Sequence, residues 1–146
     1  MACNSRGVDC KYIIPKGYVG PVVIMFDDKN GEAEKYDNGM RVYQIPLNGV
    51  LKTKFTENRK PHKVLFYYNE DGILKQIPVV MFSDSLILNK EKTDTIICGL
   101  ENGEDYYQNT PQIFETFIIA PYNRTDSVSN LNSKFLWHAM PSKSSN

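Results

Sequence analysis

The fold is decided by the stretch from Val64 to Ile77, which reads VLFYYNEDGILKQI. Two runs of aromatic and aliphatic residues flank the dipeptide Asp71-Gly72. Asp and Gly accept the positive φ angles of a two-residue hairpin turn, and the twist of that turn matches the twist of the flanking strands. The stretch therefore predicts an antiparallel β-hairpin.

Four Asn-Gly dipeptides, at residues 30–31, 38–39, 48–49 and 102–103, stand beside short apolar runs in the same way. Their spacing predicts about eight or nine short strands, in an antiparallel β-sandwich of the immunoglobulin-like kind or in a small barrel. The run from Val22 to Phe26 is apolar at every position, so we expect both of its faces to be covered.

The remaining pattern sets the expected boundaries. We expect a flexible leader or tether over residues 1–11, one sandwich domain over 12–140 and a disordered tail over 141–146. Residues 101–111 are polar and aromatic and are expected to form a loop. The period changes in the tail, where one short helix is predicted from four apolar residues at helical spacing: Val128, Leu131, Phe135 and Leu136.

Composition excludes several classes of protein. The chain has 146 residues, with 17 basic and 17 acidic side chains and no basic stripe, so the electrostatic signature of a nucleic-acid-binding protein is missing. No apolar run approaches the roughly 20 residues that span a bilayer as a helix. We expect no cofactor.

The N-terminus resembles a mature bacterial lipoprotein. Cys3 precedes a polar stretch, Asn4 to Asp9, as it does when a lipoprotein precursor is cut just before its lipidated cysteine. We interpret Met1-Ala2 as a start added in front of that cysteine. The alternative is an ordinary cytosolic start with an incidental Cys3.

The other two cysteines leave two interpretations open. Cys10 and Cys98 can form a disulfide, which would suit an oxidising compartment. Alternatively, Cys98 lies in the apolar run Thr95 to Cys98 as a small buried residue, which we favour.

Signatures of catalysis and metal binding are missing from the sequence. It contains no Gly-x-Ser-x-Gly, no phosphate-binding glycine loop, no His-Glu-x-x-His and no Cys-x-x-Cys. His62 and His138 have no ligand-spaced neighbours, and the acidic clusters lack the spacing of a calcium loop. We therefore expect a protein that is not an enzyme, with no catalytic residues and no bound metal.

Tyrosine and tryptophan supply the candidate ligand-binding residues. Adjacent tyrosines on a strand point to opposite faces, so one ring of such a pair is expected to face outward. Exposed rings near Asn and Asp side chains suit a glycan or a protein partner, although the same rings can simply cover sandwich edges. The candidates are Tyr67, Tyr68, Tyr106, Tyr107 and Trp137, with Tyr122 as a further aromatic residue.

Two segments resemble a known family. The segment from Tyr12 to Val22 reads YIIPKGYVGPV, and the segment from Tyr43 to Thr53 reads YQIPLNGVLKT. Together they resemble an uncharacterised family of small bacterial secreted domains and lipoproteins with Ile-Pro-x-Gly-Tyr-x-Gly and Ile-Pro-x-Asn-Gly-x-x-Lys-Thr. The resemblance covers residues 12–75. It implies a transthyretin-like (prealbumin-like) sandwich and a lipidated Cys3, and it brings no catalytic residues.

Three functions remain open. The first is a non-catalytic domain of the bacterial cell envelope, held on the membrane by lipid at Cys3 and acting as a binding or assembly module for a protein or a glycan. The second is a hydrolase for carbohydrate or peptide that uses loop carboxylates around Asp28, Glu70 and Glu104. The third is a cytosolic interaction protein of the immunity type.

Overall fold

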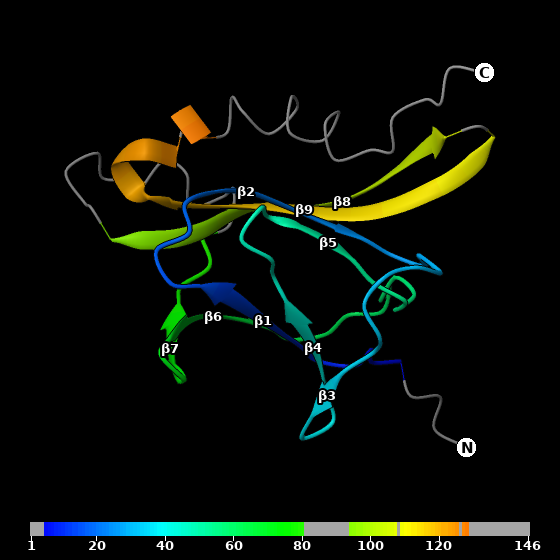
Figure 1. Cartoon of the computed structure of the whole chain (residues 1–146), viewed down its shortest axis with the longest axis horizontal. Coiled ribbons are helices and arrows are strands. Elements are labelled where there is room, and N and C mark those ends of the chain that lie inside the picture. The colour runs from blue at the N-terminus through cyan, green and yellow to red at the C-terminus, as the bar shows by residue number, and fades with distance from the viewer. Residues whose placement is uncertain (1–4, 81–93, 108, 126, 129–146) are drawn as a thin grey trace.

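The computed structural model describes residues 5–80, 94–107, 109–125 and 127–128. Within these residues, nine strands form two sheets that lie one above the other (Figure 1). The five-stranded sheet has the order β3 (Tyr36–Asp37), β4 (Met40–Gln44), β1 (Cys10–Pro15), β6 (Val64–Glu70), β7 (Ile73–Ile77). The four-stranded sheet has the order β5 (Val50–Lys52), β2 (Gly20–Met25), β9 (Thr110–Pro121), β8 (Thr95–Tyr107), and a 3-10 turn, η2 (Tyr122–Arg124), follows β9. The all-β sandwich predicted from the sequence is confirmed.

The sheets are mixed rather than purely antiparallel. Strand β1 pairs in parallel with both β4 and β6, and β2 pairs in parallel with β5. The reason is the path of the chain, which alternates between the two sheets after β1, β2, β4, β5 and β7. After each passage through the other sheet, β4 and β6 run parallel to β1 and β5 runs parallel to β2, whereas β3, the first strand after β2, is antiparallel to β4.

Two of the five Gly-containing dipeptides form the predicted hairpin turns. Asn38 and Gly39 join β3 to β4 with φ angles of 48° and 78°, and Asp71 and Gly72 join β6 to β7 with φ angles of 54° and 90°. Positive φ at both central residues is the requirement of a two-residue hairpin whose twist matches its strands.

The other three dipeptides have different roles. Asn30-Gly31 and Asn48-Gly49 lie in connections that carry the chain from one sheet to the other. Asn102-Gly103 lies inside β8, where Gly103 pairs with Phe114 of β9. The loop predicted over residues 101–111 is therefore wrong, because these residues belong mostly to a long β8–β9 hairpin that projects past its neighbouring strands (Figure 1).

An aromatic cluster fills the space between the sheets. The Tyr12 ring stacks on Tyr43 and Phe66, with centroid separations of 5.0 and 4.5 Å, and meets Phe117 edge-on at 5.6 Å. All six residues of β2 are buried, as the apolar run predicted. Because these rings come from β1, β4, β6 and β9, they join both sheets into one core.

Ordered structure begins before residue 12. The amide of Gly7 donates to the carbonyl of Pro61 at 2.9 Å, Asp9 accepts from the amide of Lys63 at 2.8 Å, and β1 starts at Cys10. The predicted leader boundary at residue 11 is therefore corrected, because residues 7–11 are held by backbone hydrogen bonds.

Cys10 and Cys98 are free thiols that face different spaces. Cys10 belongs to the core between the sheets, whereas Cys98 packs with Ile118, Ala120 and Val128 on the other face of the four-stranded sheet. The disulfide that the sequence left open as an alternative is therefore not formed, because the sheet separates the two sulfur atoms, and the favoured interpretation holds in that Cys98 is half-buried in an apolar cluster. Residue 3, with its predicted lipidation, and most of the predicted C-terminal helix lie outside the described residues.

Candidate ligand-binding pocket

The parallel pairing of β1 and β6 gives the sandwich two distinct ends. The two strands run in register from Cys10 opposite Val64 to Pro15 opposite Asn69. The N-terminal segment and the loop that ends at Lys63 therefore meet at one end of the sandwich. Lys16, which follows β1, and Glu70, the last residue of β6, lie at the other end. A six-residue strand separates these ends by roughly 20 Å.

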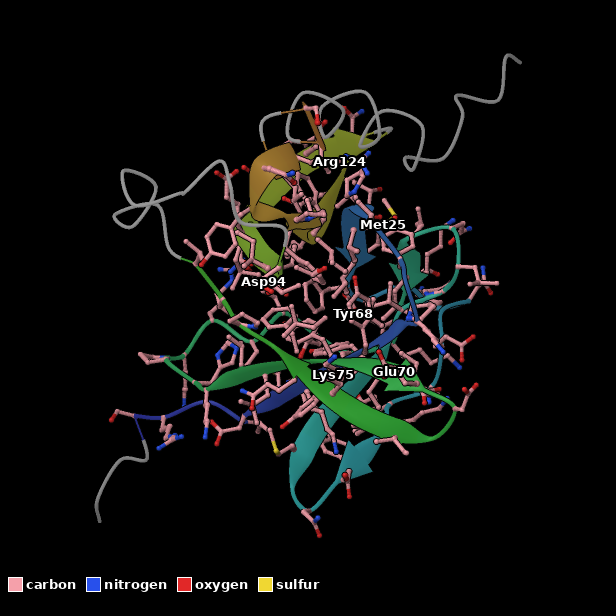
Figure 2. All side chains as sticks on the ribbon, turned by 90° about the vertical axis from the view of Figure 1, so that its left-hand side faces the viewer. Met25, Tyr68, Glu70, Lys75, Asp94 and Arg124 are labelled. Carbon is pink, nitrogen blue, oxygen red and sulfur yellow. The ribbon has the colours of Figure 1, made fainter. Side chains whose placement is uncertain are left out.

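A pocket of about 640 Å³ opens at the end where β1 and β6 finish. It lies between the β1–β2 loop, the β6–β7 hairpin, the start of β8 and η2, and we call it the end pocket. Figure 2 views the molecule from this end and labels four residues that line the pocket: Tyr68, Glu70, Lys75 and Asp94. The volume is in the range of small-molecule binding sites.

The β6–β7 hairpin forms one wall of the end pocket. Alternation along β6 puts Tyr68 and Glu70 on the same face as the buried Phe66, and Lys75 lies opposite Tyr68 on β7. The face that is apolar in the core thus becomes charged where the strands pass the edge of the other sheet. This change from apolar to charged side chains on one face is the sequence signal for the pocket.

Tyr68 is fixed in this wall by its hydroxyl group. That group donates to the carbonyl of Tyr18 at 2.7 Å, which ties β6 to the β1–β2 loop. Burial raises the pKa of Tyr68, and a hydrogen bond with Thr95 opposes this rise. The half-buried ring therefore remains neutral and presents an aromatic surface to the pocket.

The opposite wall comes from the start of β8 and from η2. Asp94, Thr95 and Tyr122 line it, and the amide of Tyr122 donates to the carbonyl of Asp94 at 3.1 Å. This hydrogen bond holds the two segments together although they are far apart in the sequence. Asp94 is exposed, whereas Thr95 and Tyr122 are half-buried.

The charges around the end pocket are balanced. Lys16 and Lys75 supply two ammonium groups, and Glu70 and Asp94 supply two carboxylates. Lys16 also reaches Asp71 of the neighbouring turn at 3.8 Å, where both side chains are exposed, so this ion pair contributes little. The lining therefore offers donors, acceptors and aromatic surface to a polar ligand that carries charges of both signs or hydroxyl groups.

Among the predicted aromatic residues whose side chains are described, Tyr68 and Tyr122 line the end pocket, and the others lie elsewhere. Tyr68 lines the end pocket, but Tyr67 lies on the other face of β6, with the Lys11 ammonium 5.7 Å from its ring centroid. Tyr106 is 69% exposed near the far tip of the β8–β9 hairpin. The side chain of Tyr107 and residue Trp137 lie outside the part of the chain whose side chains are described.

The carboxylates of the hydrolase alternative are also separated. Glu70 lines the end pocket, whereas β2 and β8 carry the chain away from that pocket before it reaches Asp28 and Glu104. The carboxylate that shares the pocket with Glu70 is Asp94. Among the described residues, no group of three or more His, Cys, Asp or Glu side chains is placed to hold a metal ion.

A buried acidic residue, Glu115, was not anticipated from the sequence. Glu115 of β9 is 7% exposed and accepts a hydrogen bond of 2.5 Å from the hydroxyl of Tyr12. The signal was present in the sequence, because Ile113, Glu115 and Phe117 share one face of the strand. Burial raises the pKa of Glu115, with the Tyr12 hydrogen bond opposing the rise.

The fold and the pocket define a mixed β-sandwich protein with a polar cavity at one end. Within the described residues, no helix has the length and apolar character needed to cross a bilayer. The chain belongs to a family of unknown function (DUF6843), whose model matches residues 6–119. This match confirms that the family is an uncharacterised one.

The chain is also similar in fold to a crystal structure of a candidate lipoprotein from Bacillus anthracis. The two share 15% sequence identity, with a TM-score of 0.58 over 77% of this chain and 70% of the other. No curated protein sequence matches the chain.

Proposed function

We propose that this protein is a non-catalytic binding domain of the bacterial cell envelope, attached to the membrane by lipid at Cys3 and binding its ligand in the end pocket. The observation that carries the proposal is the separation of the two ends. The N-terminal segment enters at the start of β1, and the pocket lies where β1 finishes. An anchor on the first residues would therefore leave the pocket open on the far side of the domain.

Three facts support the anchor. Cys3 stands two positions before Ser5, the first described residue. Residues 7–10 are fixed to the body of the domain by hydrogen bonds, so the tether between lipid and domain would be short. The similarity in fold to a candidate lipoprotein agrees with this assignment. Stable attachment needs more than one acyl chain, which a lipidated N-terminal cysteine would provide.

The pocket supports a ligand that is polar and extended. Its two lysines and two carboxylates match the ends of a peptide or the hydroxyl and amide groups of a glycan. Tyr68 and Tyr122 provide the flat surfaces on which sugar rings or apolar side chains can lie.

The anchor is tested on protein purified from its natural host. Intact-mass spectrometry of the membrane fraction should show acyl chains on Cys3 and no residues before it. Recovery of the protein from the soluble fraction with an unmodified Cys3 would contradict the anchor and favour the cytosolic alternative.

The pocket is tested by NMR with two probes, tri-N-acetylglucosamine and trialanine. We expect at least one probe to shift amide resonances of Tyr68, Lys75 and Tyr122 but not of Tyr106. The double variant Glu70→Gln/Asp94→Asn should weaken this binding, whereas Glu101→Gln, an exposed carboxylate on β8, should not. The absence of shifts with both probes would contradict binding at this pocket, and breakdown of a probe would contradict a non-catalytic role.

A further inference from the structure

A concentration of positive charge lies at the end of the sandwich opposite the end pocket. Residues 5–11 and 57–63 together contain five Lys or Arg residues and two acids, in a chain whose formal net charge is zero. Four of these cations, Arg6, Arg59, Lys60 and Lys63, stand before the first residues of β1 and β6, together with His62. We call these five residues the basic rim.

Hydrogen bonds hold the two segments of the basic rim side by side. Gly7 donates to the carbonyl of Pro61 and Cys10 to the carbonyl of Lys63, each at 2.9 Å. The side-chain amide of Asn58 donates to the carbonyl of Val8 at 2.6 Å. The loop and the N-terminal segment therefore form one surface, which includes Arg6, a residue close to Cys3 in the sequence.

The two acids in these segments neutralise only part of the charge. Asp9 accepts one hydrogen bond from the amide of Lys63 and two from Arg6, at 2.9 and 3.0 Å, and these bonds lower its pKa. Glu57 forms an ion pair with Arg59 at 2.5 Å, and Arg59 also interacts electrostatically with Glu104. The four cations of the rim therefore outnumber the two acids of these segments.

The basic rim also contains an open hollow. This space of about 520 Å³ at the surface is lined by Ser5, Arg6, Pro61, His62 and Lys63. An anionic phosphate group placed there would meet the ammonium group of Lys63 and the guanidinium group of Arg6, which is also paired with Asp9. The end pocket differs in this respect, because its charges are balanced.

We propose that the basic rim binds the anionic phosphate headgroups of the membrane to which Cys3 is attached. The identity of this membrane rests on the proposed lipid anchor, but the binding itself does not require acylation. Lys and Arg near an anionic bilayer surface are attracted to it over about one Debye length. If the rim contacts the bilayer, β1 and β6 run away from the membrane surface, and the end pocket faces away from the membrane.

The test uses the full chain produced without acylation and sucrose-loaded vesicles. Co-sedimentation should be stronger with phosphatidylcholine vesicles that contain phosphatidylglycerol than with phosphatidylcholine alone. It should weaken when the salt concentration is raised from roughly 0.05 M to about 0.5 M. Equal sedimentation with both kinds of vesicle at low salt would overturn the proposal.

Matched variants separate the rim from net charge. Lys60→Gln/Lys63→Gln should lower the partition coefficient about 10- to 25-fold, since each lysine contributes roughly fivefold at an anionic surface. Lys16→Gln/Lys75→Gln removes the same charge at the other end and should change it less than about twofold. Circular dichroism checks that both variants are folded. Equal losses in the two pairs would overturn the proposal.

Two further outcomes are decisive. Displacement of the protein from vesicles by inorganic phosphate at constant ionic strength would show a site for free phosphate rather than for a lipid surface, and would overturn the proposal. Acylated Cys3 without dependence on phosphatidylglycerol would overturn only the role of the rim. Dependence on phosphatidylglycerol without acylation would overturn only the anchor.

Discussion

Glu115 places a carboxyl group between the two sheets, where Tyr12 donates a hydrogen bond to it. Replacing Tyr12 by Phe keeps the stacked ring but leaves the buried carboxyl group without this donor. We expect the free energy of unfolding to fall by about 1–3 kcal/mol, which is the usual cost of an unsatisfied buried polar group. Urea denaturation measures it. Tyr67→Phe, on the other face of the sheet, is the control and should change stability little.

The same carboxyl group makes stability depend on pH. Because burial raises the pKa of Glu115, the folded protein holds its proton at pH values where the unfolded chain, with a value near 4.5, has lost it. The contribution of Glu115 to stability is therefore fully present below this value and is lost as the pH rises through the raised pKa. Asp9 acts in the opposite direction, because its lowered pKa costs stability as the pH falls below 3.8.

Glu115→Gln isolates this dependence. Between pH 4.5 and neutrality, the unfolding free energy of the natural protein should fall relative to that of the variant. Urea denaturation at a series of pH values, with the two proteins compared at each value, measures the difference. Curves that stay parallel across this window would contradict a raised pKa for Glu115.

Among the elements, the turns within a sheet and the turns between sheets impose different demands on glycine. Gly39, in the β3–β4 hairpin, has a φ of 78° and open space where a Cβ atom would lie. Gly49, between β4 and β5, has a φ of 77°, but its Cβ atom would lie 2.7 Å from the carbonyl oxygen of Pro21. The two positions therefore share the backbone strain and differ in the steric contact.

This pair predicts unequal costs. Gly39→Ala should lower stability by about 1 kcal/mol, from the positive φ alone. Gly49→Ala should cost a further 1–3 kcal/mol or so, because the backbone of β2 must move. Thermal or urea unfolding of both variants measures the difference, and equal costs would show that the connection between the sheets is not tightly packed.

The positions of most strands could be predicted, because the apolar runs and the turn residues are local features. Strand order could not, because an Asn-Gly pair that closes a hairpin looks the same as one that carries the chain to the other sheet. Asn38-Gly39 and Asn48-Gly49 illustrate this. The length of β8 was also missed, because charged residues such as Glu101 and Glu104 on an edge strand resemble a loop.

The candidate site depends on strand order and was therefore predicted only in part. Tyr68 and Glu70 were named from their own segment, and both line the end pocket. Lys75 was not named, although it lies opposite Tyr68 in the hairpin that the sequence predicted. Lys16 and Asp94 were not named either, since they join the site only because β1 runs parallel to β6 and β8 starts beside η2. Proximity of this kind is set by long-range pairing, which a single sequence does not encode in any local pattern.

At the scale of the whole molecule, β1 determines both the architecture and the proposed orientation. It is the central strand of its sheet, hydrogen-bonded to β4 on one side and to β6 on the other. The aromatic ring of Tyr12, a residue of this strand, packs against rings from both sheets. The strand also connects the basic rim to the end pocket. The N-terminal segment is thus part of the core of the molecule rather than a tether beside it.

This role of β1 predicts the effect of shortening the chain. A chain that starts at residue 5 should unfold at nearly the same urea concentration as the full chain, whereas one that starts at Tyr12 should fail to fold. The second chain loses Cys10 from the core and the hydrogen bonds from residues 7–10 to Pro61 and Lys63. Urea denaturation and two-dimensional NMR of both chains test this. A well-dispersed spectrum from the shorter chain would restore the flexible leader over residues 1–11 and would remove the structural link between the anchor and the end pocket.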